Sequence, residues 1–411
     1  MTITSLVRAD TTLRRLLTVT LIGAVGRGVF LPLTALYLTT VAGLPALTVG
    51  VALTCAGAVG VGSSLVFGHL ADRWSPRRLL VALQVAQGAG MIAYVAVRDV
   101  PTLILVASLV TLAQQGGTSV RSAAIGRAFP GDERVRVRAA MRTVTNFGIA
   151  AGTAVAAVPL AIGTGAAYRV TMGCAGILFL GSSVLLLGLS TARVSPPAAA
   201  PVEGGLSPYR NRVFLLMTAL SGVFGLQFGL IEVAVPLWVV GHTRAPHVLA
   251  SLLLLLNTVV VVVLQVRMSR GTGDLRGAGR VMTRAAWLMA GSCLLFAAGG
   301  WMSPWLAVGT LVAAALAQAF AEILSSAATW NMSFELADPR RLGAYQGVYG
   351  TGYALAAMVA PTVVTVTAIE MGTAGWVLLA VMFLGSGFGL AVLARSSAAS
   401  VAPASPSPVS S

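Results

Sequence analysis

The sequence predicts an all-α membrane protein in which twelve transmembrane helices form two similar six-helix bundles. Of the 411 residues, 57% are hydrophobic and only 9% are charged, and the mean hydropathy is +0.88. A water-soluble domain could not cover its surface with so few charges. A bilayer span needs about 20 apolar residues, so a chain of this length holds roughly twelve spans and no soluble catalytic domain.

The apolar runs, cut at arginine, glycine, proline and acidic clusters, place the spans one after another. In the first half of the chain the predicted spans are 16–41, 46–70, 79–97, 102–126, 139–163 and 170–191. In the second half they are 212–240, 248–267, 280–300, 305–330, 343–367 and 374–394. Because twelve is an even number, we expect both ends of the chain on the same side of the membrane.

The arginines predict which side that is. The arginine-rich connections are 71–78, 127–138, 192–211 and 268–279, whereas the alternate connections contain only Arg98, Arg169 and Arg244. Positive charge is retained on the cytoplasmic side of membrane proteins. We therefore expect a multi-pass protein of a bacterial cytoplasmic membrane with both termini in the cytoplasm. The net charge of +15 then follows from topology and does not indicate a nucleic-acid partner.

A proline-, alanine- and glycine-rich stretch divides the chain into two parts. We expect an N-terminal half at 1–191, a cytoplasmic linker at 192–211, a C-terminal half at 212–395 and a disordered cytoplasmic tail at 396–411.

The two halves also resemble each other at a shift of just over two hundred residues. Pro32 in span 1 corresponds to Pro236 in span 7, and Gly148 in span 5 corresponds to Gly352 in span 11. Internal repeats of this kind are the usual architecture of secondary transporters.

Five charged side chains stand out within the predicted spans: Arg27, Arg121, Arg142, Glu232 and Glu322. An ionised group at the centre of an isolated helix costs about 2.5–3.5 kcal/mol, so such residues usually face the bundle interior and serve function. We predict that Glu322 and Glu232 carry protons, with Glu322 the stronger candidate. A purely structural ion pair with arginine is the alternative. For Arg27 and Arg121, contact with a solute and a counter-charge role both remain open.

Polar side chains follow one helix face in spans 1, 4, 7 and 10. Glu322, for example, shares a face with Gln318 and Ser325, and a continuous polar face points away from lipid. These faces predict a central cavity. Its candidate side chains are Arg27, Arg121, Thr34, Gln115, Thr118, Gln318, Ser325, Asn257 and Tyr349. Interhelical hydrogen bonds would explain Asn257 equally well, and helix packing would explain Tyr349.

The sequence has no group of His, Cys, Asp and Glu with metal-ligand spacing. We therefore expect no metal, no cofactor and no enzymatic activity. The expected partners are the lipid bilayer, a small-molecule solute and protons, and we expect a monomer. A sensory or scaffolding membrane protein, which would bind a ligand without moving it, is left open by these observations.

The connection between spans 2 and 3 carries a family signature. It reads Gly68-His69-Leu70-Ala71-Asp72-Arg73-Trp74-Ser75-Pro76-Arg77-Arg78, which resembles the G-x-L-A-D-R-x-G-R-R loop of the major facilitator superfamily. Ser75 stands where the family usually has glycine, and Pro76 displaces the basic pair by one position. The resemblance implies that Gly68, Asp72, Arg73, Arg77 and Arg78 form a cytoplasmic gate, with Asp72 at the first amides of span 11, around Leu342 to Tyr345.

Two further stretches resemble a prokaryotic multidrug-efflux branch of that superfamily. One runs from Arg142 through Asn146 and Gly148 to Gly152, and the other contains Glu322. Thr153 stands where the antiporter signature has proline, and the usual arginine of span 4 is absent unless Arg121 replaces it. The resemblance implies proton antiport that exports a hydrophobic or amphipathic drug or secondary metabolite. Uptake of a small metabolite, by proton coupling or by facilitated diffusion, is the alternative.

Overall fold

The computed structural model describes residues 10–129, 132–189, 205–246, 248–268 and 274–401. All regular structure in these ranges is helical. Ten of the described helical segments are long and apolar enough to cross a membrane, and Leu252–Met268 is a shorter apolar segment. Together with the first helix they give twelve rods.

The N-terminal half contains six rods, of which the first ends in a short π-helical turn and the third in a short 3-10 turn. They are α2 (Thr11–Leu36) with η1 (Tyr37–Val41), α3 (Ala46–Arg73), α4 (Pro76–Ala93) with η2 (Tyr94–Ala96), α5 (Val100–Ala128), α6 (Asp132–Ile162), and α7 (Gly165–Gly181) with α8 (Ser183–Leu187).

The C-terminal half repeats this arrangement. Its rods are α10 (Arg212–Gly225) with α11 (Gln227–Gly229), η3 (Leu230–Ala234) and α12 (Val235–His242), then α13 (Val248–Met268), α14 (Leu275–Gly299), α15 (Pro304–Glu335), η4 (Pro339–Arg341) with α16 (Leu342–Val364) and η5 (Thr365–Glu370), and α17 (Thr373–Val401).

Each rod coincides with one predicted span, so the twelve-helix prediction is confirmed. Two boundaries differ in a way that matters for function. Helix α6 begins at Asp132 and α15 continues to Glu335, so each is several residues longer than the apolar run. Charged residues that we assigned to connections therefore belong to helices.

The structure describes only parts of the predicted linker and of the predicted C-terminal tail. Residues 192–204 of the predicted linker and 402–411 of the predicted tail lie outside the described residues. Residues 396–401, which we assigned to the tail, continue α17 as helix.

Acidic N-caps fix where several helices begin. The Asp10 carboxylate accepts the Thr12 amide at 2.8 Å, and Asp274 accepts the Gly277 amide at 3.0 Å. Asp99 accepts the Thr102 amide at 2.8 Å, and this hydrogen bond holds the pKa of Asp99 below its ordinary value. These bonds satisfy amides that lack a partner within their own helix.

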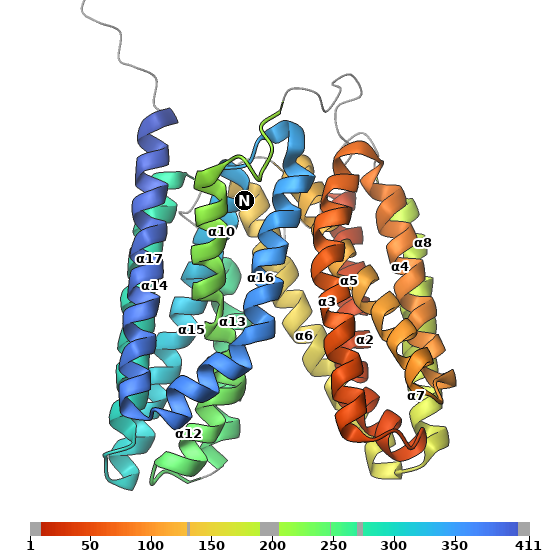
Figure 1. Cartoon of the computed structure of the whole chain (residues 1–411), viewed down its shortest axis with the longest axis horizontal. Coiled ribbons are helices and arrows are strands. Elements are labelled where there is room, and N and C mark those ends of the chain that lie inside the picture. The colour runs from red at the N-terminus through yellow and green to blue at the C-terminus, as the bar shows by residue number, and fades with distance from the viewer. Residues whose placement is uncertain (1–9, 130–131, 190–204, 247, 269–273, 402–411) are drawn as a thin grey trace, which may run out of the picture.

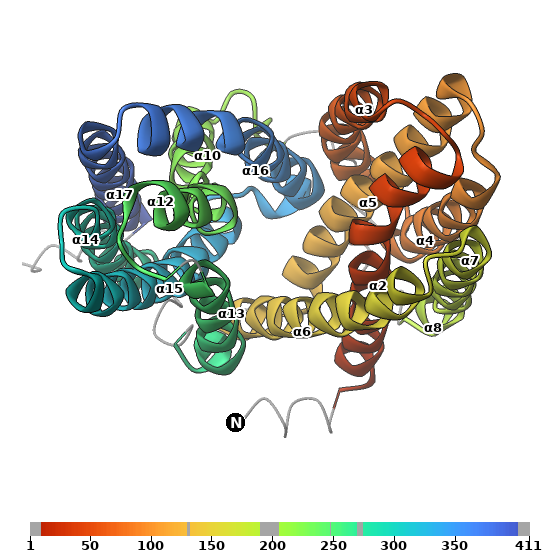
Figure 2. The same cartoon turned by 90° about the horizontal axis from the view of Figure 1, so that it is seen from below.

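The two halves form separate bundles that meet at one end (Figure 1). We call this the arginine-rich end, defined by Arg73, Arg78, Arg127, Arg134 and Arg341. There α3 lies against α16, and α6 lies against α13 and α15. Seen from the opposite end, the bundles stand side by side with α6 and α13 bridging them (Figure 2).

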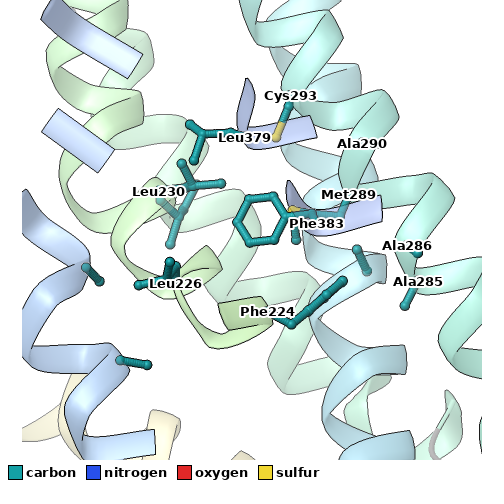
Figure 3. Packing of buried hydrophobic residues seen from close by; sticks show 14 of the residues in the cluster. Phe224, Leu226, Leu230, Ala285, Ala286, Met289, Ala290, Cys293, Leu379 and Phe383 are labelled. Atoms are coloured by element: carbon teal, nitrogen blue, oxygen red, sulfur yellow. The ribbon is translucent and has the colours of Figure 1, made fainter. Parts of the chain in front are cut away.

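Each half has its own apolar core. In the C-terminal half, Phe224 of α10 and Phe383 of α17 meet edge to face at 5.5 Å between ring centres. Phe383 lies among Leu230, Met289 and Leu379 (Figure 3). Because lipid tails are as apolar as these side chains, close packing stabilises the bundle where the hydrophobic effect cannot. Separate cores allow the halves to move as units.

Candidate functional site between the two halves

A cavity of about 410 Å³ lies between the halves and is bounded by α2, α3, α5, α6, α15 and α16. The polar and aromatic side chains that line it are Thr20, Arg27, Ser64, Gln115, Thr118, Ser119, Arg121, Ser122, Arg138, Arg142, Thr145, Trp330, Gln346, Tyr349 and Tyr353. The volume suits a drug-sized ligand.

The charge of this cavity is one-sided. Four arginines line it, namely Arg27, Arg121, Arg138 and Arg142, and none of the described lining residues is acidic. Low-dielectric walls focus the field of like charges, which raises the local concentration of anions.

One arginine is neutralised by an ion pair that connects the halves. Arg142 of α6 donates to the Glu322 carboxylate and to the Ser326 hydroxyl of α15. Asn257 of α13 donates to the second Glu322 oxygen at 3.3 Å. The Glu322 side chain is only 5% exposed, and a buried carboxylate of this kind needs a cation and hydrogen-bond donors.

Arg142 is the last member of a row of arginines on α6. Arg134, Arg138 and Arg142 follow at intervals of four, so they share one helix face. Arg134 pairs with Glu335. Arg138 donates to the Gln346 side-chain oxygen at 3.2 Å and lies over the rings of Trp330, Phe334 and Tyr349.

The row therefore fastens one face of α6 to α15 and α16 of the other half. Ion pairing, hydrogen bonding and cation–π contacts all contribute. Phe228 lies under the Arg142 guanidinium at 5.1 Å, which adds α11 to the contact.

A second junction forms around Asp72 at the end of α3. Its two oxygens accept the amides of Gly343 at 2.6 Å and Ala344 at 2.7 Å in the first turn of α16. Arg127 of α5 pairs with the same carboxylate at 2.5 Å. The expected position of Asp72 at the start of span 11 is thus present. An anion at a helix N-terminus is favoured by unpaired amides and by the helix dipole.

Small residues let α3 and α16 approach to backbone contact at this junction. A Cβ atom on Gly68 would come within 2.7 Å of both the Gly343 oxygen and the Gly347 Cα. Ser64 donates to the Gly347 oxygen at 3.1 Å. Close crossings of membrane helices depend on small residues four apart.

Among the described residues, the arginines of the signature loop form no ion pair or hydrogen bond with the C-terminal half. Arg73 and Arg78 are exposed, and Arg77 reaches the Leu189 carbonyl within its own half at 3.4 Å. The ion-pair partner of Asp72 is Arg127, because Arg127 ends α5 directly beside α3, whereas α3 ends at Arg73 and turns its arginine outward.

The glycines of the span 5 motif serve a contact within the N-terminal half. A Cβ atom on Gly152 would lie 2.1 Å from the Val25 oxygen, and one on Gly28 would lie 2.2 Å from the Ile149 oxygen. Gly148 likewise faces Ala24, and Thr153 donates to the Gly28 oxygen at 3.3 Å. Asn146 lies on α6 one turn beyond Arg142.

Five of the predicted cavity residues line the cavity: Arg27, Arg121, Gln115, Thr118 and Tyr349. The other four do not. Thr34 donates to the Phe30 carbonyl of its own helix, and Gln318 donates to the Gln227 carbonyl. Ser325 accepts from Gln227, and Asn257 is bound to Glu322. Each of these four side chains thus makes a hydrogen bond within the protein, Thr34 inside its own helix and the other three to a neighbouring helix.

Glu232 lies in the π-helical turn η3, directly before Pro236, and its side chain is exposed. Proline lacks an amide hydrogen and disturbs the turn before it, and π-turns are frequent at functional sites. Glu232 follows Phe228 by four residues, but it does not belong to the described cavity lining.

The sequence did not lead us to expect Arg138, Gln346 and Trp330 in the cavity lining, nor the contacts of Arg138 with the other two residues. We assigned Arg138 to a basic connection because the apolar run begins at residue 139. The four-residue spacing of Arg134, Arg138 and Arg142 was the available signal, since it places all three on one helix face.

Comparison with known proteins agrees with this architecture. Residues 16–361 match the sequence profile described as Major Facilitator Superfamily. The chain is 29% identical over 133 residues to an uncharacterized MFS-type transporter, YdeE, of Escherichia coli strain K12, and this match covers 32% of the chain and about a third, 34%, of that relative's length.

Two solved structures share the fold at low sequence identity. The human organic anion transporter MFSD10 (TETRAN) has a TM-score of 0.71 with 16% identity, covering 92% of this chain and 99% of its own. A bacterial homologue of the iron transporter ferroportin in an outward-facing state has a TM-score of 0.70 with 13% identity, covering 94% and 98%.

Twelve helices in two bundles, a polar cavity between them and a family match over most of the sequence lead to one conclusion. The chain belongs to the major facilitator superfamily and is a multi-pass membrane transporter of a small molecule, not an enzyme.

Proposed function

We propose that the protein exports a hydrophobic or amphipathic small molecule across the bacterial cytoplasmic membrane in exchange for protons, by alternating access between its two halves. The observation that carries this proposal is the ion pair of Glu322 with Arg142, which joins one half to the other beside the cavity.

Protonation of Glu322 would control the contact between the halves. A neutral carboxyl group no longer balances the Arg142 charge, so the attraction between α15 and α6 falls. Ser326 and Asn257 could still hold their hydrogen bonds to one partner each. A proton that arrives from outside would thus favour separation at the arginine-rich end, and its release inside would restore the pair.

The direction of opening follows from charge topology. The arginine-rich end corresponds to the cytoplasmic side by the positive-inside rule. There the bundles are held together by Asp72, which accepts the Gly343 and Ala344 amides of α16, and by the ion pair of Arg134 with Glu335. In this arrangement the cavity is closed toward the cytoplasm. Protonation would open it to that side, where the solute to be exported is bound.

Transport into inverted vesicles tests the proposal. The substrate is first chosen from a panel of amphipathic drugs, as a compound whose growth inhibition of a pump-deficient host is relieved by this gene. With no membrane potential imposed, we expect accumulation in vesicles only under an imposed pH gradient. Glu322→Gln should abolish the gradient-driven part, whereas Glu370→Gln, an exposed acid in η5, should leave it unchanged. Full gradient-driven flux in both Glu322→Gln and Glu232→Gln would show that neither acid carries the proton.

Uptake of a metabolite is the second candidate, because the same ion pair could equally couple proton entry to inward movement of a solute. The direction of accumulation in intact cells separates the two. Export predicts a lower cell content of the compound in cells with the gene, and uptake predicts a higher content.

A further inference from the structure

We infer that the solute is an organic anion and that Arg27 of α2 and Arg121 of α5 bind its acidic group. This inference rests on the proposed function and names the substrate class of the same cavity.

The two arginines are the cavity cations that have no partner. Within the described part of the chain, Arg142 pairs with Glu322 and Arg138 is bound to Gln346 and three aromatic rings. Neither Arg27 nor Arg121 forms an ion pair with any described carboxylate, and the two repel each other. A charged side chain at membrane depth normally has a counter-charge, so here the counter-charge is best supplied by the ligand.

A third group points to the same place. Thr20 lies two helical turns before Arg27 on α2, lines the cavity and is only 3% exposed. Its hydroxyl has no hydrogen-bond partner among the described residues. A buried hydroxyl without a hydrogen bond lowers the stability of the protein. An oxygen of a bound acid would accept a hydrogen bond from this hydroxyl.

The chemistry of these donors selects the acid. Two guanidinium groups supply positive charge and only hydrogen-bond donors, and the Thr20 hydroxyl supplies one further donor, a set that suits the oxygens of a carboxylate, sulfonate or phosphate ester. A cationic drug would be repelled.

The opposite wall of the cavity indicates the chemistry of the rest of the solute. Trp330, Tyr349, Tyr353, Ala354 and Ala357 of the C-terminal half present rings and methyl groups to the cavity. An aromatic acid would place its charge on the N-terminal half and its rings on the C-terminal half. Such a ligand contacts both bundles, as a solute must if its binding is to be coupled to their relative movement.

Binding to the purified full-length protein in phosphatidylcholine nanodiscs, which contain no anionic lipid, tests the inference. The probes are 1-naphthoate and 1-naphthalenesulfonate, with the neutral 1-naphthamide as the matched control. We expect both anions to bind at least about tenfold more tightly than the amide. Arg27→Gln and Arg121→Gln should each weaken naphthoate binding about tenfold and leave naphthamide binding unchanged, while Arg27→Lys should retain part of the preference.

The control variant is Arg280→Gln, which removes an exposed arginine of α14 and should bind both probes like the wild type. Thermal unfolding verifies that each variant is folded, and removal of one of two repelling charges should not lower stability. Equal affinity of wild type for naphthoate and naphthamide, no naphthoate binding at millimolar concentration, or an unchanged preference in both Arg27→Gln and Arg121→Gln would overturn the inference.

The experiment uses no pH gradient, so its outcome is separate from that of the proposed proton coupling. If the protein prefers anions but shows no gradient-driven flux, the proposed anion site is supported and the proposed proton antiport is refuted. If gradient-driven flux depends on Glu322 but the protein shows no preference for anions, the proposed antiport is supported and the proposed anion site is refuted.

Discussion

At the scale of single residues, the pair of Glu322 and Arg142 differs from an exposed ion pair because the Glu322 side chain is almost fully enclosed by protein and cannot turn to water. Removing one partner leaves an uncompensated charge inside the protein, which typically costs 3–5 kcal/mol. Protonation removes only the negative charge of Glu322 and leaves Arg142, which lines the cavity, in place without its counter-charge, so it weakens the contact reversibly and without loss of a side chain. A proton can therefore switch this contact, whereas a truncation damages it.

We expect Arg142→Ala to lower the free energy of unfolding by about 3 kcal/mol or more, because Glu322 then remains buried without its cation. Adding Glu322→Gln to that variant should recover part of the loss. Denaturant unfolding in detergent micelles measures both, with Arg169→Ala, at an exposed arginine of α7, as the control. Equal stability of Arg142→Ala and wild type would contradict a buried pair.

Asp72 gives a second prediction at this scale. Asp72→Ala removes one acceptor from two amides of α16 and from Arg127, and hydrogen bonds to a charged group contribute about 1.5–3 kcal/mol each. We expect the arginine-rich end to open. Spin labels at the exposed positions 78 and 340, in a cysteine-free background, should move apart.

The control for this opening is Asp274→Ala, which removes an N-cap of α14 away from the junction. Its label distance should equal that of the wild type. An unchanged distance in Asp72→Ala would show that other contacts hold the halves together without this carboxylate.

At the scale of helices, the crossing of α2 and α6 depends on the absence of side chains. Gly152→Ala would put a Cβ atom 2.1 Å from the Val25 oxygen, so the helices must separate. We expect a loss of about 1–3 kcal/mol, the usual cost of overpacking. Gly181→Ala, in α7, meets no atom within 4 Å and should be neutral or slightly stabilising, because alanine favours helix. Thermal unfolding compares the two. If Gly152→Ala were as stable as Gly181→Ala, the close crossing would not be required.

At the scale of the whole molecule, the two proposals together determine the electrical character of transport. Exporting a monovalent anion while importing one proton moves two charges in the same electrical sense. Each charge gains about 2.3 kcal/mol per 100 mV, so an inside-negative potential should drive export even when the pH gradient is zero. Proteoliposomes with potassium gradients and valinomycin measure this dependence.

The neutral Glu322→Gln variant provides the control, since without proton movement only the anion responds to the potential. We expect the variant, if it retains facilitated movement, to show about half the dependence of the wild type. Flux of naphthoate that is indifferent to potential at a fixed pH gradient would contradict the combination of anion export and proton import.

The sequence by itself determined the helices, because a bilayer demands long apolar runs with internally bonded backbones. All twelve rods follow from that demand. The expected orientation in the membrane follows from the distribution of the arginines. The family signature around Asp72 could also be recognised from the sequence, and the resemblance placed the Asp72 carboxylate at the start of span 11.

Only the tertiary structure decided which polar groups meet. Arg142 was one of three candidate cations for two acids, and helix periodicity cannot choose among partners that lie 180 residues apart. Helix periodicity also could not separate Gln318 and Ser325, which form hydrogen bonds with Gln227, from Arg27 and Arg121, which form no ion pair with a described carboxylate. Hydropathy indicates whether a side chain is buried, whereas its hydrogen-bond and ion-pair partners depend on how the helices pack, both within each bundle and between the two bundles.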